Sequence, residues 1–117
     1  MPEKRAAPRH SERLSLLVSS EPQGRFEIET LNVSLSGAYC RSRYFLPIMT
    51  RLTVTLVLPG QKKQQNLSAA AVVVRVNPST DAGSAGFYDM ALYFTGMKPD
   101  EQERLGAFLR SRAEGGN

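Results

Sequence analysis

The run of β-branched residues and leucines at 52–58 (LTVTLVL) most constrains the fold of this 117-residue chain. Such a run predicts a strand, and Pro59 and Gly60 end it. A second run, 67–76, follows a Gln/Lys-rich stretch at 61–65 that predicts a hairpin tip. The alanines and valines in the middle of 67–76 indicate either burial on both sides or a sheet that curves on itself. An antiparallel pair of strands therefore forms the middle of the predicted fold.

Four shorter segments with apolar or alternating patterns predict the remaining strands: 14–18, 26–31, 38–42 and 87–94. After them, Pro99 and the acids that follow it are typical of a helix start. Leu105, Phe108 and Leu109 fall on one stripe of that helix. The chain has the length of one domain. The predicted fold is mainly β, a small antiparallel barrel of six strands with a C-terminal helix that covers one face or opening.

The predicted domain organisation has three parts. Residues 1–12 are polar, contain two prolines and form a flexible N-terminal arm. Residues 13–112 form the barrel and its helix, and 113–117 form a disordered tail. The start of the chain has no apolar signal region. The longest run of small apolar residues in the whole chain, 69–74, is too short to span a bilayer. We therefore expect a cytoplasmic protein.

The charge distribution and the rarity of cysteine and histidine exclude several classes of function. The chain has 15 basic and 11 acidic residues, a net charge of +4. Between residues 30 and 80 there is no acid, and six basic residues lie there: Arg41, Arg43, Arg51, Lys62, Lys63 and Arg75. They are either solvated outward positions or a positive face for a phosphorylated ligand. A single Cys40 and a single His10 exclude a disulfide, a cysteine zinc cluster and a His-rich metal site. No residue set supports catalysis, so we expect neither an enzyme nor a cofactor.

Two short motifs are candidates for ligand binding. Arg5 and Arg9 are four apart in a segment that Pro8 keeps extended, so both point to one side, about 13 Å apart. Two guanidiniums at that spacing could hold opposite ends of a compact dianion. In the second motif, Asn32 and Ser34 are two apart at a strand end, where both side chains can face one side. Their amide and hydroxyl groups can bind a base edge. Gly37 allows either a close backbone approach or a positive φ.

The two motifs together resemble the signature of PilZ domains, bacterial receptors for cyclic di-GMP. RxxxR near the N-terminus is followed about twenty-five residues later by [D/N]xSxxG. Gly37-Ala38, Val74-Arg75, the segment 90–94 and the terminal helix also match, so the resemblance covers about residues 4–112. The chain has Asn32 where the family often has Asp, and Ser36 where a glycine is common.

The resemblance implies a cytoplasmic sensor that binds cyclic di-GMP and signals to an unidentified effector protein. It implies that Arg5 and Arg9 hold phosphates and guanine edges, that Asn32 and Ser34 contact a guanine, and that Gly37 shapes the turn. Lys4, directly before Arg5, implies a stacked pair of ligand molecules. Neither binding to polymeric nucleic acid nor membrane insertion is expected. The alternatives are a small basic β-barrel that binds single-stranded nucleic acid through exposed aromatics, and a PilZ adaptor that binds only protein.

Overall fold

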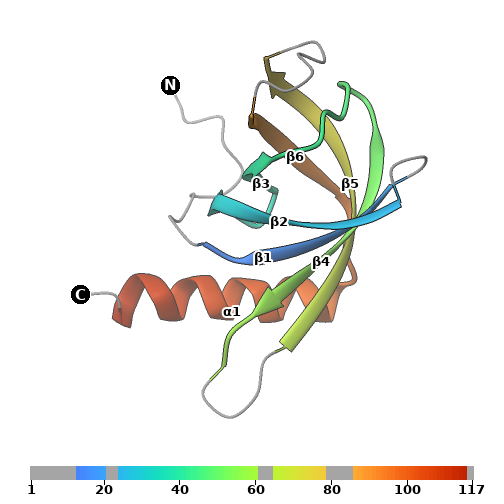
Figure 1. Cartoon of the computed structure of the whole chain (residues 1–117). Coiled ribbons are helices and arrows are strands. Elements are labelled where there is room, and N and C mark those ends of the chain that lie inside the picture. Colours follow the sequence, from blue (N-terminus) through green and yellow to red (C-terminus); the bar gives the residue numbers. More distant parts are fainter. Residues whose placement is uncertain (1–12, 21–23, 61–64, 79–85, 116–117) are drawn as a thin grey trace, which may run out of the picture.

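A closed barrel with one helix forms the described part of the chain (Figure 1). The computed structural model describes residues 13–20, 24–60, 65–78 and 86–115, with the backbone alone at 113–115. Within these residues six strands and one helix form: β1 (Ser15–Ser20), β2 (Gly24–Val33), β3 (Gly37–Ser42), β4 (Arg51–Leu58), β5 (Gln65–Asn77), β6 (Tyr88–Gly96) and α1 (Pro99–Gly115). All neighbouring strands are antiparallel, in the order β1-β2-β3-β6-β5-β4. The predicted fold class is confirmed.

The element boundaries differ from the predicted ones by a few residues. Strand β2 continues to Val33, into the segment that the sequence assigned to a connection, and β6 continues to Gly96. The helix includes residues 113–115, which the predicted domain organisation assigned to the tail. The expected hairpin tip lies mostly outside the described residues, and Gln65 already belongs to β5. The arm 1–12 also lies outside them.

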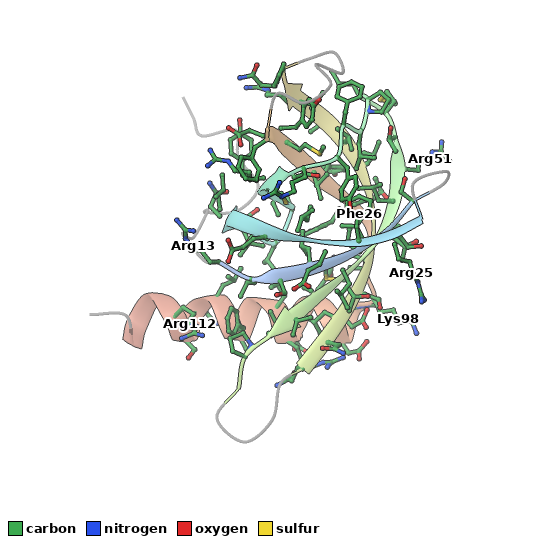
Figure 2. The ribbon with its side chains drawn as sticks, in the orientation of Figure 1. Arg13, Arg25, Phe26, Arg51, Lys98 and Arg112 are labelled. Atoms are coloured by element: carbon green, nitrogen blue, oxygen red, sulfur yellow. The ribbon has the colours of Figure 1, made fainter. Side chains whose placement is uncertain are left out.

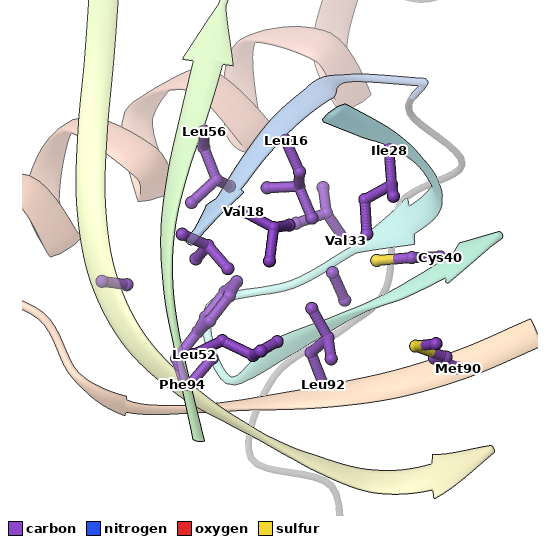
Figure 3. Close-up of a cluster of buried hydrophobic side chains, with 14 of the residues drawn as sticks. Leu16, Val18, Ile28, Val33, Cys40, Leu52, Leu56, Met90, Leu92 and Phe94 are labelled. Carbon is purple, nitrogen blue, oxygen red and sulfur yellow. The ribbon is translucent and has the colours of Figure 1, made fainter. Parts of the chain in front are cut away.

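The inward side chains of all six strands form one core (Figure 3). Strand β5 contributes Leu67, Ala69, Ala71 and Val73, while Ala70 between them is exposed. Burial on both sides of β5 is therefore wrong, and the alternative of a curved sheet is correct. The small alanines suit an interior in which strands from all sides approach one another.

Two ladders of the barrel are irregular. The β2–β3 register shifts between Thr30 and Asn32, and the β5–β6 register shifts between Val73 and Arg75 and again beside Ala71. The ladders that involve β1 and β4 have no shift. Each shift leaves an extra residue in one strand, which changes which face the following side chains occupy.

Helix α1 covers one end of the barrel (Figure 1). Leu105 and Leu109 are buried against the core, as the predicted stripe requires, and Phe108 packs beside them. The Glu101 carboxylate accepts a hydrogen bond from the backbone N–H of Ser68 at 3.4 Å. Among the described residues no helix is long and apolar enough to cross a membrane.

Candidate functional site

The second motif lies where β2 ends and β3 begins, at the end of the barrel that α1 covers. Asn32 is the second-to-last residue of β2, Ser34 lies in the connecting turn, and Gly37 is the first residue of β3. The structure thus brings these three residues together. Lys4, Arg5 and Arg9 lie outside the described residues, and their roles stay predictions.

The Ser34 hydroxyl holds the turn together from inside. Ser34 is fully buried. Its oxygen accepts a hydrogen bond from the backbone N–H of Ser36 at 3.1 Å and lies 3.0 Å from the Ser36 hydroxyl. The Ser34 backbone N–H donates to the Gly37 carbonyl at 2.8 Å. Ser34 therefore shapes the turn, and its contact with a guanine stays a prediction.

Gly37 is required because β3 and β6 approach each other closely here. A Cβ atom at Gly37 would collide with the Leu92 carbonyl oxygen and lie 3.3 Å from the Tyr93 Cα. The φ angle of Gly37 is outside the left-handed region. Of the two interpretations from sequence, the close backbone approach is confirmed and the positive φ is wrong.

A β-bulge sets the position of Asn32. Thr30 and Val33 are fully buried, whereas Leu31 and Asn32 between them are partly exposed. Without the extra residue, Asn32 would be in phase with Thr30 and point into the core. The bulge instead places two consecutive side chains on the outer face, where Asn32 lies opposite Tyr39 of β3.

The strands beside Asn32 carry arginines on the same side of the sheet. The Arg41 Nε donates to the Asp89 carboxylate at 2.8 Å, and this hydrogen bond together with the carboxylate's charge raises the pKa of Arg41. The Arg43 guanidinium lies 5.1 Å from the centre of the exposed Phe87 ring. Arg41, Arg43 and Phe87 line a groove of about 740 Å³ that reaches Arg13, the first described residue after the arm (Figure 2). Arg25, Glu27 and Glu29 of β2 also line it. Its four arginines can bind an anion with a flat apolar part, and the charges of Glu27 and Glu29 oppose that binding.

Cys40 lies in the interior of the barrel in this region. Cys40 is fully buried on β3, as a core cysteine should be, and burial raises the pKa of its thiol to about 12. In the part of the chain that the structure describes, no cluster of His, Cys, Asp and Glu could hold a metal ion.

Sequence reasoning missed which residues share the face with Asn32. Tyr39 pairs with Ala91 of β6, and Ala91 pairs with Arg75 of β5. Arg75 was noticed only as one of six basic residues in an acid-free stretch. The only sequence signal for its position was the pair Val74-Arg75, since strand order and register are needed to place it on the same outer face as Asn32.

The chain belongs to the PilZ domain family, whose model matches residues 3–111. This match confirms the resemblance found in the sequence. It covers the arm, the barrel and most of α1. No curated protein sequence is significantly similar to the chain.

Solved structures share the fold at low sequence identity. The chain is similar to Bacillus subtilis MotI/DgrA, an inhibitor of motility, with a TM-score of 0.78 and 16% identity over 97% of this chain and 53% of that one. It is similar to the PilZ domain of Escherichia coli YcgR with c-di-GMP, with a TM-score of 0.66 and 11% identity. The match covers 98% of this chain and 99% of that one. It is also similar to the K. pneumonia MrkH–c-di-GMP complex, with a TM-score of 0.68 and 16% identity. The match covers 98% of this chain and 55% of that one. The chain thus spans about half the length of MotI and of MrkH.

Proposed function

We propose that this chain is a receptor for cyclic di-GMP. The observation that carries the proposal is the hydrogen-bonded turn 34–37 beside the outward-facing Asn32. The buried Ser34 hydroxyl and the contact of Gly37 with β6 hold this turn, and the bulge in β2 places Asn32 on the outer face. Membership of the PilZ family and the c-di-GMP complexes of YcgR and MrkH support the choice of ligand.

In this proposal the two motifs bind different parts of the ligand. The Asn32 amide binds the edge of one guanine, and the Ser34 turn keeps that amide in place. Arg5 and Arg9 bind phosphates and guanine O6 and N7, which match the two parallel N–H groups of a guanidinium. Lys4 supplies charge for a second, stacked ligand molecule. No step of this function is catalytic.

In this proposal the N-terminal arm, residues 1–12, transmits the signal of ligand binding. Residues 1–12 hold arginines, a lysine and two prolines but few large apolar side chains. We infer that they close over the ligand, since charge-assisted hydrogen bonds can outweigh the entropy lost on ordering. The closed arm then presents a new surface beside the barrel, which an effector protein binds.

Titration calorimetry with cyclic di-GMP tests the function directly. We expect saturable binding, with two ligand molecules per chain at high ligand concentration. A ratio that stays at one would remove the role of Lys4 in a stacked pair. No heat of binding by the folded wild-type chain would overturn the receptor function itself.

Substitutions in the motifs test the assigned roles. Losing one partner of a desolvated charged pair costs about 2–5 kcal/mol, so R5A or R9A should weaken binding by about 30-fold to several thousand-fold. The melting temperature should not change. S34A should lower both affinity and stability, by about 1–3 kcal/mol each, because it leaves turn groups unsatisfied. Normal affinity in R5A and R9A, measured beside the control R104Q at an exposed position on α1, would contradict the proposed site.

Hydrogen exchange tests the closing of the arm. Amides of residues 3–12 should exchange freely without ligand and become protected with cyclic di-GMP. Those of β4 and β5 should change little, because these strands already form ladders in the barrel. Equal protection of the arm in both states would leave binding intact and remove the switch.

A specific observation favours a second candidate, the binding of single-stranded nucleic acid. Tyr44, Phe87 and Tyr93 are each about half exposed, and arginines lie beside Phe87. Exposed aromatics can stack bases. A polymer that neutralises many phosphates loses about 10³-fold in affinity between 50 and 200 mM salt, whereas a ligand with two phosphates loses far less. An oligonucleotide that binds more tightly than cyclic di-GMP at physiological salt would establish this candidate instead.

A further inference from the structure

The barrel has a second end, opposite the one that α1 covers (Figure 1). Strands β1, β3 and β5 end there, and β2, β4 and β6 begin there. We call this end the mouth. The segment 43–50 connects β3 to β4, which are not neighbours in the barrel, so it crosses the mouth. Its Leu46 is fully buried, and the Phe45 ring lies 5.4 Å from the ring of the buried Tyr88, so the segment closes the core.

Exposed apolar side chains gather at the mouth. Among the described residues eight large apolar side chains are exposed, and four of them lie at this end: Tyr44, Ile48, Met49 and Phe87. Ile48 and Met49 are adjacent, and they are 51% and 68% exposed. A single exposed apolar residue is ordinary, whereas a group of them on one face marks a surface that contacts something outside the chain.

Backbone hydrogen bonds hold the turn that carries these two residues. The Met49 N–H donates to the Val73 carbonyl of β5 at 2.7 Å, and the Val73 N–H donates to the Thr50 carbonyl at 3.0 Å. The Thr50 N–H donates to the Pro47 carbonyl at 3.1 Å. Met49 itself has a φ of 78°, in the left-handed region that favours glycine. The Met49 side chain therefore projects from a turn that is fixed to β5.

The mouth also carries positive charge. Three exposed arginines lie there, on β2, directly after β3 and at the start of β4: Arg25, Arg43 and Arg51. In the part of the chain that the structure describes, none of the three forms an ion pair. Asp89 of β6 is paired with Arg41, and the Glu27 carboxylate accepts a hydrogen bond from the Ser15 hydroxyl. The mouth thus combines apolar side chains with cations that lack a counter-charge among the described residues.

We propose that the mouth binds an anionic phospholipid surface. Ile48 and Met49 pack among the lipid head groups, and the arginines bind the phosphate and carboxylate groups around them. Apolar side chains that project from a turn suit a fluid lipid surface, because such a surface needs no matching shape. A protein partner would instead need a packed apolar core of complementary shape. The contact is peripheral, so no segment of the chain enters the hydrocarbon interior, and it does not depend on cyclic di-GMP.

This orientation keeps the turn 34–37 away from the lipid. Strand β2 begins at the mouth with Gly24 and ends with Val33 at the end that α1 covers. Arg25 and Asn32 are therefore about 20 Å apart along the strand. A chain that binds lipid through its mouth still presents Asn32 and the turn to a ligand in solution.

Vesicle sedimentation with the full chain tests the proposal. The probes are vesicles of equal parts phosphatidylserine and phosphatidylcholine, and vesicles of phosphatidylcholine alone. M49G removes the apolar side chain and puts glycine at a positive φ, so the fold should be kept. R51Q removes one cation. The matched controls are L17S, at a leucine of β1 that is 46% exposed, and R110Q, at an exposed arginine of α1.

We expect the wild-type chain to bind the vesicles that contain phosphatidylserine and not those of phosphatidylcholine alone. Binding should weaken as salt is added, because the attraction is electrostatic in part. R51Q and M49G should each weaken binding about fivefold, the scale of one arginine near an anionic surface and of one partly buried apolar side chain. The controls L17S and R110Q should change it by less than about twofold. Melting curves close to that of the wild type confirm that each variant folds.

Three other outcomes would contradict the proposal. Equal losses in R51Q and R110Q would show that net charge alone attracts the chain, which overturns the mouth as the site. A loss in R51Q without one in M49G would overturn the packing of apolar side chains among head groups. No binding to phosphatidylserine vesicles would overturn lipid binding altogether. Binding of a glutamate-rich peptide that M49G and R51Q both weaken would then assign the mouth to an acidic protein segment.

Discussion

The barrel has a regular half and an irregular half. Strands β1 and β4 pair with every neighbour without a shift in register, and their outward residues include threonines, serines and the exposed Leu17. The β2–β3 and β5–β6 ladders each contain a bulge, and the site residues lie there. Both halves contribute to one core.

This difference separates two tasks within one sheet. Regular alternation buries every second side chain, which stabilises the barrel but fixes which residues can face outward. A bulge frees a strand from that alternation, so it can present two consecutive side chains outward and still return to the core. The regular half closes the barrel, and the irregular half displays polar groups on it.

Removing core volume from the regular half should have the largest effect on stability. Leu56 of β4 is fully buried, so L56A should lower the free energy of unfolding by about 3–5 kcal/mol. Affinity for cyclic di-GMP, measured well below the melting temperature, should stay within about twofold. The control L17A removes the same atoms from a side chain that is 46% exposed and should cost under about 1 kcal/mol. A large loss of affinity in folded L56A would contradict the division into halves.

A change at Gly37 should affect stability and binding together. In G37A the new Cβ meets the Leu92 carbonyl, a backbone atom that can move only if β6 moves. We expect a loss of about 2–4 kcal/mol in unfolding free energy and at least tenfold weaker binding. The control G96A places its Cβ 3.7 Å from Ala70, an ordinary contact, and should be tolerated. If G37A melted like the wild type, the close approach of β3 to β6 would not be what requires glycine.

The strands, the helix stripe and the local motif could be predicted because each depends on residues near in sequence. Alternation within 87–94 puts Met90, Leu92 and Phe94 on one face, and all three are buried. The spacing of Asn32, Ser34 and Gly37 was enough to place a turn there. These features arise from local periodicity and turn chemistry.

The bulges could not be predicted, because nothing in a single strand shows which partner it will have. Period-2 reasoning placed Asn32 and Ser34 on one side, yet Ser34 is fully buried and Asn32 is partly exposed. The same reasoning in β5 puts Arg75 inside. Only the pairing of strands far apart in sequence places Arg75 on the same outer face as Asn32.

We expect Cys40, on the buried face of the irregular half, to be shielded from water as fully as the core residues of the regular half. Burial on β3 raises the pKa of Cys40 from its ordinary 9.0 to about 12. Above pH 9 the thiol therefore loses its proton in the unfolded chain and keeps it in the folded one. The contribution of the protonated Cys40 to folding stability is fully present below pH 9 and is lost as the pH rises toward 12. At pH 10 the loss is about 1.4 kcal/mol. Denaturant titrations should show this extra loss between pH 8 and 10 in the wild type and not in C40A, and equal slopes would mean that the thiol is accessible.

The smallest expected effect concerns Asp89 of β6, one of the acids on the outer face of the irregular half. Asp89 pairs with Arg41 in the ladder and lies two residues before Ala91 on the same face of β6, about 7 Å along the strand. Its negative charge opposes an anionic ligand there, although Arg41 partly neutralises it. At that separation in water the repulsion is about 0.6 kcal/mol, so D89N should tighten binding of cyclic di-GMP about threefold at low salt, and the gain should shrink as salt is added. The control D100N makes the same change in charge on α1, where Asp100 pairs with Arg104, and should leave the affinity unchanged. If D89N weakened binding instead, Asp89 would hold Arg41 in the orientation that the ligand needs, and the irregular half would depend on its ion pair as well as on its bulges.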